Sequence, residues 1–305
     1  MEKILVFGHR SPDTDTICSS IVMANLQAKV REQEVLPCRL GEINEETKYA
    51  LKYFNTEVPQ LIEKVEEGQP VILVDHNEFT QSVEGIENAK IDTVVDHHRI
   101  NNFQTSEPLF YFAQPVGCTS TILFELYNLN NVEIEPKIAG LMLSAIISDT
   151  LLLKSPTTTP KDKKAVEKLA EIAKVDINEY GLEMLKAGTD LDKYTEDELI
   201  RLDAKKVEKE DVKYVIAQVN TVSIPDVLKR KAKIEQEINK EILAKGLSLF
   251  VFVITDIVNS NSEAIVLGDR ADAIGKTYEI KDNIAVMPGV VSRKKQVLPL
   301  VEKNI

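Results

Sequence analysis

The sequence predicts an α/β protein with two domains. The N-terminal domain has a mainly parallel sheet flanked by helices, and a smaller C-terminal α/β domain has a mixed sheet. In the first part of the chain, short runs rich in Val, Ile and Leu alternate with helical patterns, which is typical of parallel strands buried on both faces. After a polar segment near residue 188 the pattern changes to longer strands around a charged helix.

The elements of the N-terminal domain follow from this alternation. Strands are expected where short apolar runs are bounded by polar or turn residues, at 4–8, 35–40, 71–75, 91–96 and 109–113. Helices are expected where apolar residues recur three and four positions apart, at 17–33, 46–54, 120–129, 136–150 and 161–175. Pro136 suits the first turn of its helix because its missing N–H is not needed there.

A polar segment divides the chain. Residues 185–199 contain Gly188 and few apolar side chains, so we expect domains at 1–187 and 196–305 with a linker at 188–195. In the C-terminal domain the expected strands are 214–222, 247–257 and 263–269. One long charged helix is expected at 224–246, ending at Gly246. The tail 282–303 is expected to form strand, turn and strand.

Composition limits the location and the partners of the protein. The 305 residues include no run of about 18 apolar residues, so no membrane span is expected. The N-terminus lacks the zones of a signal peptide, and the three cysteines are odd in number with no CxxC pair, which favours the reducing cytoplasm. The net charge of −12 opposes general nucleic-acid binding. It does not exclude an anionic substrate, because bound divalent metals reverse the field locally.

Four short stretches carry the acidic and imidazole side chains that suggest chemistry. They are GHRSPDTD (8–15), VDHNE (74–78), VDHHR (95–99) and Asp149 in AIISDT (145–150). All four histidines of the chain lie in the first three stretches. The carboxyl ends of parallel strands meet at one edge of a sheet, so these side chains are expected to converge there. The alternative interpretation, an isolated helix cap or solvated loop at each position, explains one such stretch more easily than four.

Carboxylates gathered in one cleft repel one another, and cations remove that cost. Mixed Asp and His donors suit Mn²⁺, Co²⁺, Mg²⁺ or Zn²⁺. The six candidate ligands are His9, Asp13, Asp15, Asp75, His97 and Asp149. Six side chains are too many for one catalytic ion, so we expect two ions that share a bridging carboxylate, and Asp75 in the middle of the set is the expected bridge. Asp96 and His76 are expected to orient the ligands through hydrogen bonds.

Basic residues late in the chain could contact an anion. Arg293 and Lys294 follow an apolar run and are expected at a strand end, where Arg offers a planar fork and Lys a point charge for phosphate oxygens. From the sequence alone, however, both of them, and Lys205 in LDAKK (202–206), are better explained as solvated surface residues. The run GDRADAIGKT (268–277) is not a phosphate-binding loop, because six residues separate its glycines where that motif has four.

Together, GHRSPDTD, VDHNE, DHH and the late SRKKQ (292–296) resemble the DHH phosphoesterase superfamily, and specifically its family II inorganic pyrophosphatases. The resemblance covers almost the whole chain. It implies one metal bound by His9, Asp13 and Asp75, and a second bound by Asp15, Asp75, His97 and Asp149. It assigns the contacts to substrate phosphate to His98, Lys205, Arg293 and Lys294.

The resemblance also implies an activity. A water or hydroxide that bridges two Mn²⁺ ions, or Co²⁺ in their place, would hydrolyse pyrophosphate to two phosphates, and the substrate would arrive with Mg²⁺. The C-terminal domain would be a DHHA2-like substrate-binding domain, and the N-terminal domains would form a homodimer.

Of three other functions, the sequence leaves the first open and opposes the other two. A DHH exopolyphosphatase would have the same metal site. An oligonucleotide phosphodiesterase of the superfamily would need a late GGGH-like segment, which the sequence lacks. A non-catalytic metal-dependent interaction protein on this fold would be expected to have lost a ligand, and none is missing.

Overall fold

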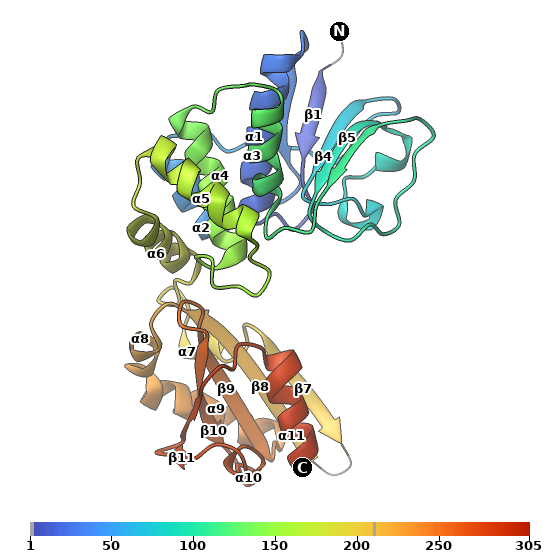
Figure 1. Cartoon of the computed structure of the whole chain (residues 1–305). Helices are drawn as coiled ribbons and strands as arrows, with labels where there is room; N and C mark the ends of the chain where they lie inside the picture. Colours follow the sequence, from blue (N-terminus) through green and yellow to red (C-terminus); the bar gives the residue numbers. More distant parts are fainter. Residues whose placement is uncertain (1–2, 210–211) are drawn as a thin grey trace. The chain divides into compact units, whose positions relative to one another are not determined.

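The computed structural model of the chain describes residues 3–209 and 212–305. It divides into two compact units, Met1–Gly188 and Thr189–Ile305. Each unit is built around its own six-stranded sheet with helices packed against it (Figure 1). The predicted fold class, a parallel-sheet α/β domain followed by a smaller mixed-sheet α/β domain, is therefore confirmed.

The sheet of the first unit is entirely parallel, in the order β3-β2-β1-β4-β5-β6. The chain starts in the middle, moves outward through β2 and β3, and returns to the other side of β1 with β4. This reversal makes a crevice beyond the carboxyl ends of β1 and β4, where open parallel sheets bind ligands. The strands are β1 Ile4–Phe7, β2 Val35–Arg39, β3 Gln60–Leu61, β4 Pro70–Val74, β5 Lys90–Asp96 and β6 Phe110–Ala113.

The helices of the first unit pack on one face of this sheet. Strand residues such as Val6, Ile72 and Val95 are fully buried beneath them, and each contributes roughly 1.5–3 kcal/mol by its burial. Loops and the short 3₁₀ turns Phe79–Gln81 and Ile86–Asn88 cover the opposite face. The helices are α1 Thr14–Val30, α2 Glu45–Tyr53, α3 Thr119–Leu129, α4 Pro136–Thr150, α5 Pro160–Ala173 and α6 Ile177–Gly188.

The sheet of the second unit is mixed, in the order β11-β12-β10-β9-β8-β7, with β8 and β9 parallel and the other pairs antiparallel. Helices α7, α8 and α9 cover one face, and α10 and α11 cover the other. The strands are β7 Ala204–Lys209, β8 Val212–Thr221, β9 Leu249–Asp256, β10 Asn261–Leu267, β11 Ile280–Lys281 and β12 Ile284–Met287. The helices are α7 Glu196–Leu199, α8 Ile224–Leu228, α9 Lys231–Lys245, α10 Asp272–Gly275 and α11 Leu298–Asn304.

The prediction of one long helix at 224–246 is wrong, because the chain turns between α8 and α9. The side chain of Arg230 lies at this turn. Its guanidinium donates to the backbone oxygens of Leu191 and Tyr194 and forms an ion pair with Glu196 at 3.1 Å. These contacts with a distant segment fix the turn, and no local sequence signal reports them.

The prediction of a second strand in the tail is also wrong. Residues Arg293–Val297 form a π-helical turn that continues into α11. Val297 and Val301 are four residues apart, and both are buried in the core of the second unit. Residues four apart lie on the same face of a helix, so a helix buries both side chains. This burial favours a helix even though β-branched residues favour a strand.

Two further sequence expectations concern location. Within residues 3–209 and 212–305, none of the helices has the length and apolar character that a membrane crossing requires. Cys18, Cys38 and Cys118 are buried free thiols, as expected for cysteines that serve as small apolar residues.

Gly140 in α4 is expected to be intolerant of a side chain. An added Cβ would lie 2.1 Å from Cε1 of Phe54, whose ring packs against Tyr180. Gly140→Ala should therefore destabilise the protein by about 1–3 kcal/mol through overpacking, although Ala is the better helix former. Urea unfolding followed by circular dichroism measures this. The exposed neighbour Lys137→Ala should change stability by less than about 0.5 kcal/mol, and a Gly140→Ala protein as stable as wild type would contradict the prediction.

Candidate metal centre

The first group of donors lies between β1 and α1. His9 follows the end of β1, and Asp13 is the N-cap of α1, where its Oδ1 accepts from the backbone N–H of Thr16 at 2.9 Å. Asp15 lies in the first turn of α1 and is fully buried. The loop and the helix start therefore aim three donors at the crevice beyond β1.

A fourth donor, Asp75, directly follows β4, the strand on the other side of the switch. It is buried, and its φ of 57° lies in the left-handed region. That conformation costs a residue with a side chain about 1–2 kcal/mol, although Asp and Asn tolerate it better than most. The strained turn holds the carboxylate in the crevice instead of along the strand.

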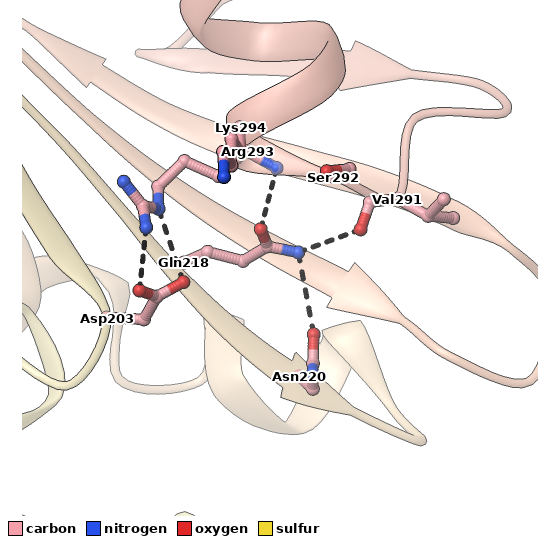
Figure 2. Close-up of a pocket in the computed structure, with 7 residues that line it drawn as sticks. All are labelled: Asp203, Gln218, Asn220, Val291, Ser292, Arg293 and Lys294. Carbon is pink, nitrogen blue, oxygen red and sulfur yellow. Dashed lines mark hydrogen bonds and ion pairs between the residues drawn. The ribbon is translucent and has the colours of Figure 1, made fainter. Parts of the chain in front are cut away.

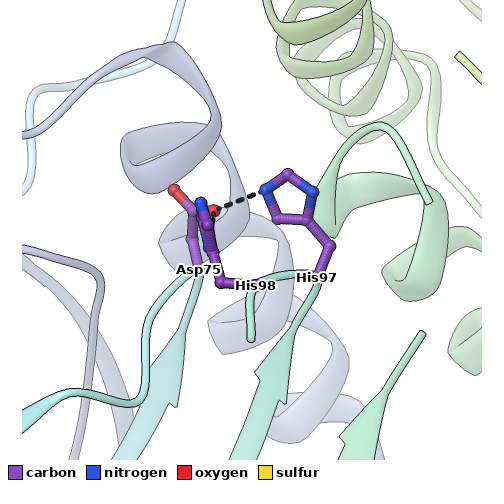
Figure 3. A group of neighbouring side chains, drawn as sticks. All are labelled: Asp75, His97 and His98. Atoms are coloured by element: carbon purple, nitrogen blue, oxygen red, sulfur yellow. Dashed lines mark ion pairs between the residues drawn. The ribbon is translucent and has the colours of Figure 1, made fainter. Parts of the chain in front are cut away.

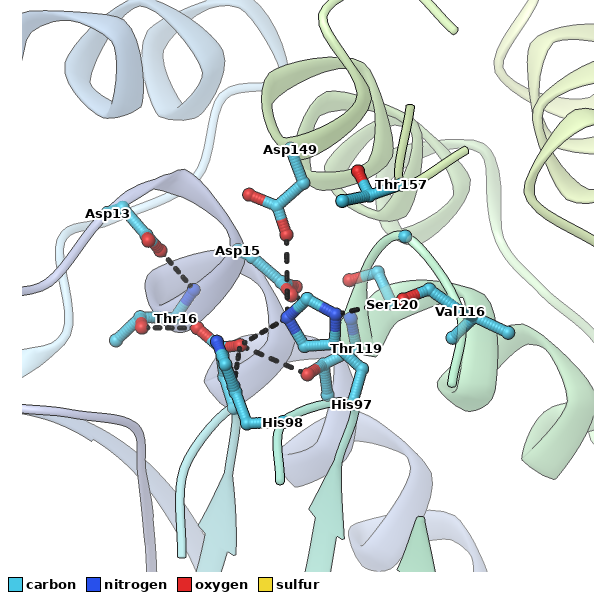
Figure 4. A network of polar contacts seen from close by, with 12 residues as sticks. Asp13, Asp15, Thr16, His97, His98, Val116, Thr119, Ser120, Asp149 and Thr157 are labelled. Carbon is cyan, nitrogen blue, oxygen red and sulfur yellow. Dashed lines mark hydrogen bonds and ion pairs between the residues drawn. The ribbon is translucent and has the colours of Figure 1, made fainter. Parts of the chain in front are cut away.

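The remaining donors come from β5 and α4. His97 and His98 follow Asp96, the last residue of β5, and Asp149 lies in the last turn of α4 (Figure 4). Four separate parts of the first unit thus contribute to one site.

Asp75 lies at the centre of the cluster. Its Oδ2 is 3.5 Å from Nε2 of His9, whereas its Oδ1 is 3.4 Å from Nε2 of His97 and 3.7 Å from Nδ1 of His98 (Figure 3). Three sets of donor atoms lie within 4.8 Å of one another: His9, Asp13 and Asp75; Asp15, His97 and Asp149; Asp75, His97 and His98. The structure therefore brings together all six candidate metal ligands and His98.

The donor set and its spacing fit divalent cations. Two ligands that each lie about 2.0–2.2 Å from one cation are about 3–3.5 Å apart when they meet at a right angle or a little more. Nε2 of His9 is 3.5 Å from both Asp13 Oδ2 and Asp75 Oδ2. These separations are long for hydrogen bonds but suit donors that share an ion.

The electrostatics also favour cations. Burial, together with the charge of Asp15, raises the pKa of Asp75 to about 7. Burial and the charges of Asp15 and Asp75 raise the pKa of Asp149 well above its usual range. Burial alone would lower the pKa of His97, but its hydrogen bond to Asp75 and the charge of Asp15 outweigh this and raise the pKa to about 9. Without a cation the cluster retains protons, and metal binding would displace them.

Neutral donors hold the carboxylates in place. The hydroxyls of Thr16 and Thr119 donate to Oδ2 and Oδ1 of Asp75 at 2.6 and 3.1 Å. Asp15 accepts from the hydroxyl of Ser19 at 2.6 Å and from the backbone N–H of Thr119 at 2.7 Å. The carboxylates are therefore oriented before any ion arrives.

Backbone and carboxylate acceptors orient the two histidines after β5. Nδ1 of His97 donates to the backbone oxygen of Val116 at 3.1 Å, which leaves Nε2 to face the cluster. Nδ1 of His98 donates to Oδ1 of the buried Asp96 at 2.9 Å. This hydrogen bond raises the pKa of His98.

His76 points away from the donors. Its Nδ1 bonds the backbone oxygen of Val74 at 2.9 Å and its Nε2 bonds the hydroxyl of Ser82 at 3.0 Å, so neither ring nitrogen is free for a metal. Burial lowers its pKa to about 4, and the ring is neutral.

The three basic candidates lie in the second unit. Arg293 and Lys294 are not at a strand end, as the sequence suggested, but in the π-helical turn before α11. They line a cavity of about 280 Å³ together with Asp203, Gln218 and Asn220 (Figure 2). Lys205 lies on the exposed edge strand β7, and it is not among the residues that line this cavity.

Arg293 is held by two side chains that the sequence analysis missed. Its Nη2 and Nε donate to Asp203 at 2.8 and 3.2 Å, and its backbone N–H donates to Oε1 of Gln218 at 2.8 Å (Figure 2). Within the described part of the chain, Nη1 of Arg293 has no protein acceptor. One edge of the guanidinium thus stays available to an anion in the cavity.

Comparison with known proteins assigns the family. The chain is 55% identical over 304 residues to the manganese-dependent inorganic pyrophosphatase of Bacillus subtilis, which covers 99% of this chain and 98% of the relative. It is also 55% identical to a protein of Bacillus velezensis named a probable manganese-dependent inorganic pyrophosphatase, with 100% and 99% coverage. The chain belongs to the family of manganese-dependent inorganic pyrophosphatases.

Two further findings agree with this family. The model described as the DHH family, N-terminal domain, matches residues 3–146, and the model described as the DHHA2 domain matches residues 182–304. A crystal structure from Methanococcus jannaschii, of a protein assigned to the family II inorganic pyrophosphatases, is 40% identical with a TM-score of 0.65 and covers 99% of both chains. The resemblance that the motifs suggested is therefore confirmed.

The hydroxyl donors around the metal centre were not singled out from the sequence. Thr16 and Ser19 follow Asp15 in α1, so helical spacing could have suggested them. Thr119 is remote in sequence from Asp15 and Asp75, and nothing in its own segment indicates the contact.

Asp75→Asn should act in opposite directions with and without metal. In chelator the variant is expected to melt about 2–4 °C higher, a gain near 1 kcal/mol, because a buried charge beside Asp15 is removed while Asn tolerates the left-handed backbone. With excess Mn²⁺ it should gain much less stability than wild type, since a ligand is lost. Differential scanning calorimetry in EDTA and in Mn²⁺ measures both effects. Asp92 lies near the start of β5, at the opposite end of the strand from His97, and it forms an ion pair with Arg31. The control variant Asp92→Asn should keep the full response to Mn²⁺. A variant that Mn²⁺ stabilises as strongly as wild type would contradict the prediction.

Proposed function

We propose that this chain hydrolyses inorganic pyrophosphate to two phosphates in a manganese-dependent reaction in the cytoplasm. The observation that carries the proposal is the convergence of His9, His97 and four carboxylates on one crevice. The name of the Bacillus subtilis relative, 55% identical along its length, supports the substrate and the metal. Buried free thiols suit a reducing compartment.

The proposed centre holds two cations. His9, Asp13 and Asp75 are the proposed ligands of the first, and Asp15, Asp75, His97 and Asp149 are those of the second. The two oxygens of Asp75 approach different histidines, as expected of a bridging carboxylate. We propose Mn²⁺ in both sites, with Co²⁺ as a substitute, and Mg²⁺ as the ion that accompanies the substrate.

The proposed roles of the protein groups follow from their placement. A divalent cation, when bound, lowers the pKa of a coordinated water from 15.7 to about 7 and so supplies a nucleophile near neutral pH. His98, anchored through Nδ1 by Asp96, presents its Nε2 as a hydrogen-bond donor to the leaving phosphate. Asp96 and His76 act as supports, since Asp96 fixes His98 and His76 fixes the turn after β4.

The second unit is the proposed DHHA2-like substrate-binding domain, joined through a linker at 188–195. Arg293, Lys294 and Lys205 are proposed to neutralise charge on the phosphate oxygens. The free edge of the Arg293 guanidinium in the cavity supports this role.

The test is a phosphate-release assay on pyrophosphate, tripolyphosphate and a nucleotide ester, with Mn²⁺, with Mg²⁺ and with chelator. Pyrophosphate should be the preferred substrate, Mn²⁺ should support activity and chelator should abolish it. Asp75→Ala should be inactive. Faster release from tripolyphosphate would favour an exopolyphosphatase, and no release from any substrate with Mn²⁺ would favour a non-catalytic binding protein.

Arg293→Ala should reduce turnover of pyrophosphate about 10²–10³-fold, the usual loss when one donor to developing charge is removed. Its affinity for Mn²⁺ should not change, because Arg293 bonds Asp203 and Gln218 within the second unit, whereas the proposed metal ligands all belong to the first unit. Steady-state kinetics together with isothermal titration of Mn²⁺ measure the two effects. Lys295→Ala, at the exposed neighbouring position, is the matched control and should retain nearly full activity. Normal turnover in Arg293→Ala would exclude the proposed phosphate contact.

A homodimer through the N-terminal unit is proposed as well. Strand β6 is the last in the sheet order, so one side of it offers unpaired backbone groups, and Phe110 on it is 52% exposed. Phe110→Lys should therefore convert a dimer into a monomer in analytical ultracentrifugation, while Lys161→Ala on α5 should not. A wild-type monomer would refute the dimer, and a Phe110→Lys dimer would exclude this edge as the interface.

A further inference from the structure

Glu46 is hydrogen-bonded to residues next to proposed metal ligands, but it is neither a proposed ligand nor a proposed contact of the substrate. It occupies the first turn of α2 and is partly buried. Its Oε1 accepts from the hydroxyl of Thr14 at 2.7 Å and from the hydroxyl of Ser148 at 2.5 Å. A single oxygen therefore connects three helices, because Thr14 begins α1 and Ser148 lies in the last turn of α4.

The two hydroxyls belong to the neighbours of proposed metal ligands. Thr14 lies between Asp13 and Asp15, and Ser148 directly precedes Asp149. Asp15 and Asp149 belong to one set of donors whose atoms lie within 4.8 Å of one another, so two carboxylates are brought together there at a cost. The bonds to Glu46 draw the start of α1 and the end of α4 together without adding a charge among the ligands themselves.

The ionised carboxylate of Glu46 is unfavourable at this position, so its presence is not explained by a contribution to folding stability. Burial raises the pKa of Glu46, and the charge of Asp13 raises it further, whereas the bonds from Ser148 and Thr14 oppose the shift. Its hydrogen-bond partners among residues 3–209 and 212–305 are these two hydroxyls, and none is a cation. A partly buried acid near other acids, with no basic partner among the described residues, is unfavourable unless its position serves another purpose.

The side chain of Glu46 packs against Gly188, the last residue of α6. A Cβ at Gly188 would lie 2.9 Å from Cβ and 3.0 Å from Oε2 of Glu46. The absence of a side chain at 188 therefore leaves the space that Glu46 occupies, and it leaves Oε1 directed at the two hydroxyls.

We infer that Glu46 is a positioning residue of the metal centre. It sets the separation between the ligands on α1 and Asp149 on α4 by accepting both hydroxyls at one oxygen. The inference rests on the metal sites proposed above. It predicts that the loss of this acceptor weakens metal binding even though no metal ligand is altered.

The test is the affinity for Mn²⁺, measured without substrate by electron paramagnetic resonance of the free ion. Glu46→Ala should weaken binding about 10–100-fold, as is typical when the partner of a metal ligand is removed. Glu46→Gln keeps the acceptor oxygen and should bind within about threefold of wild type. Glu45→Ala, the neighbouring position on α2, is the matched control and should bind as wild type does. Turnover of Glu46→Ala should recover at high Mn²⁺, since the catalytic groups are intact.

Each outcome has a separate meaning. Wild-type affinity in Glu46→Ala would overturn the inference, and so would a Glu46→Gln protein as weak as Glu46→Ala, because the charge would then matter and not the hydrogen bonds. Wild-type protein that binds no Mn²⁺ would instead overturn the proposed metal centre. If Glu46→Ala fails to fold, Ser148→Ala removes one of the two bonds while keeping a good helix former. A loss of affinity of severalfold in that variant supports the inference, and an unchanged affinity refutes it.

Discussion

Repulsion among buried carboxylates is the constraint on which the first unit depends. Asp15, Asp75 and Asp149 are drawn into one crevice, where burial and the charge of Asp15 raise the pKa of both Asp75 and Asp149. Such a cluster is unfavourable for folding by itself. The surrounding structure reduces this cost with neutral hydrogen-bond donors. The hydroxyls of Thr16, Thr119 and Ser19 carry no charge themselves, and they donate to the carboxylate oxygens. The acids are therefore held in place by neutral groups, which leave their charge uncompensated.

The topology of the sheet brings these acids together. His9 and Asp75 follow β1 and β4, the two strands that flank the reversal of strand order, so both enter the crevice with little extra chain. Asp75 adopts a left-handed backbone there, which aims its two oxygens at different histidines. One strained residue at the switch of a parallel sheet thus places a single carboxylate between donors that follow β1 and donors that follow β5.

The sequence predicts this part of the molecule well because the signals are local and repeated. Short apolar runs locate the strands. In a parallel sheet, an Asp or His directly after a strand must lie at the edge formed by the carboxyl ends of the strands. In the tail 282–303 the expected first strand is present as β12, and only the expected second strand is wrong. Val290, Val291 and Val297 suggest a strand, whereas the burial of Val297 and Val301 follows a helical period that appears only when the core is known. The break between α8 and α9 depends on acceptors near residues 191–194, far from Arg230 in the sequence. Partners of this kind cannot be found from a local pattern.

In both units, hydrogen bonds from neighbouring residues orient charged side chains, acids in the first unit and Arg293 in the second. In the first unit, acids that would repel one another are oriented by neutral hydroxyls, and the compensating charge is left to a ligand. In the second unit, the cationic Arg293 is oriented by Asp203 and Gln218 through Nε, Nη2 and the backbone N–H, and the remaining edge of the guanidinium is left to a ligand. Each unit thus fixes the direction of its charged groups without satisfying them completely. A net charge of −12 does not exclude an anionic ligand, because the local orientation of charged groups, together with any cation that they hold, decides the field that an anion meets.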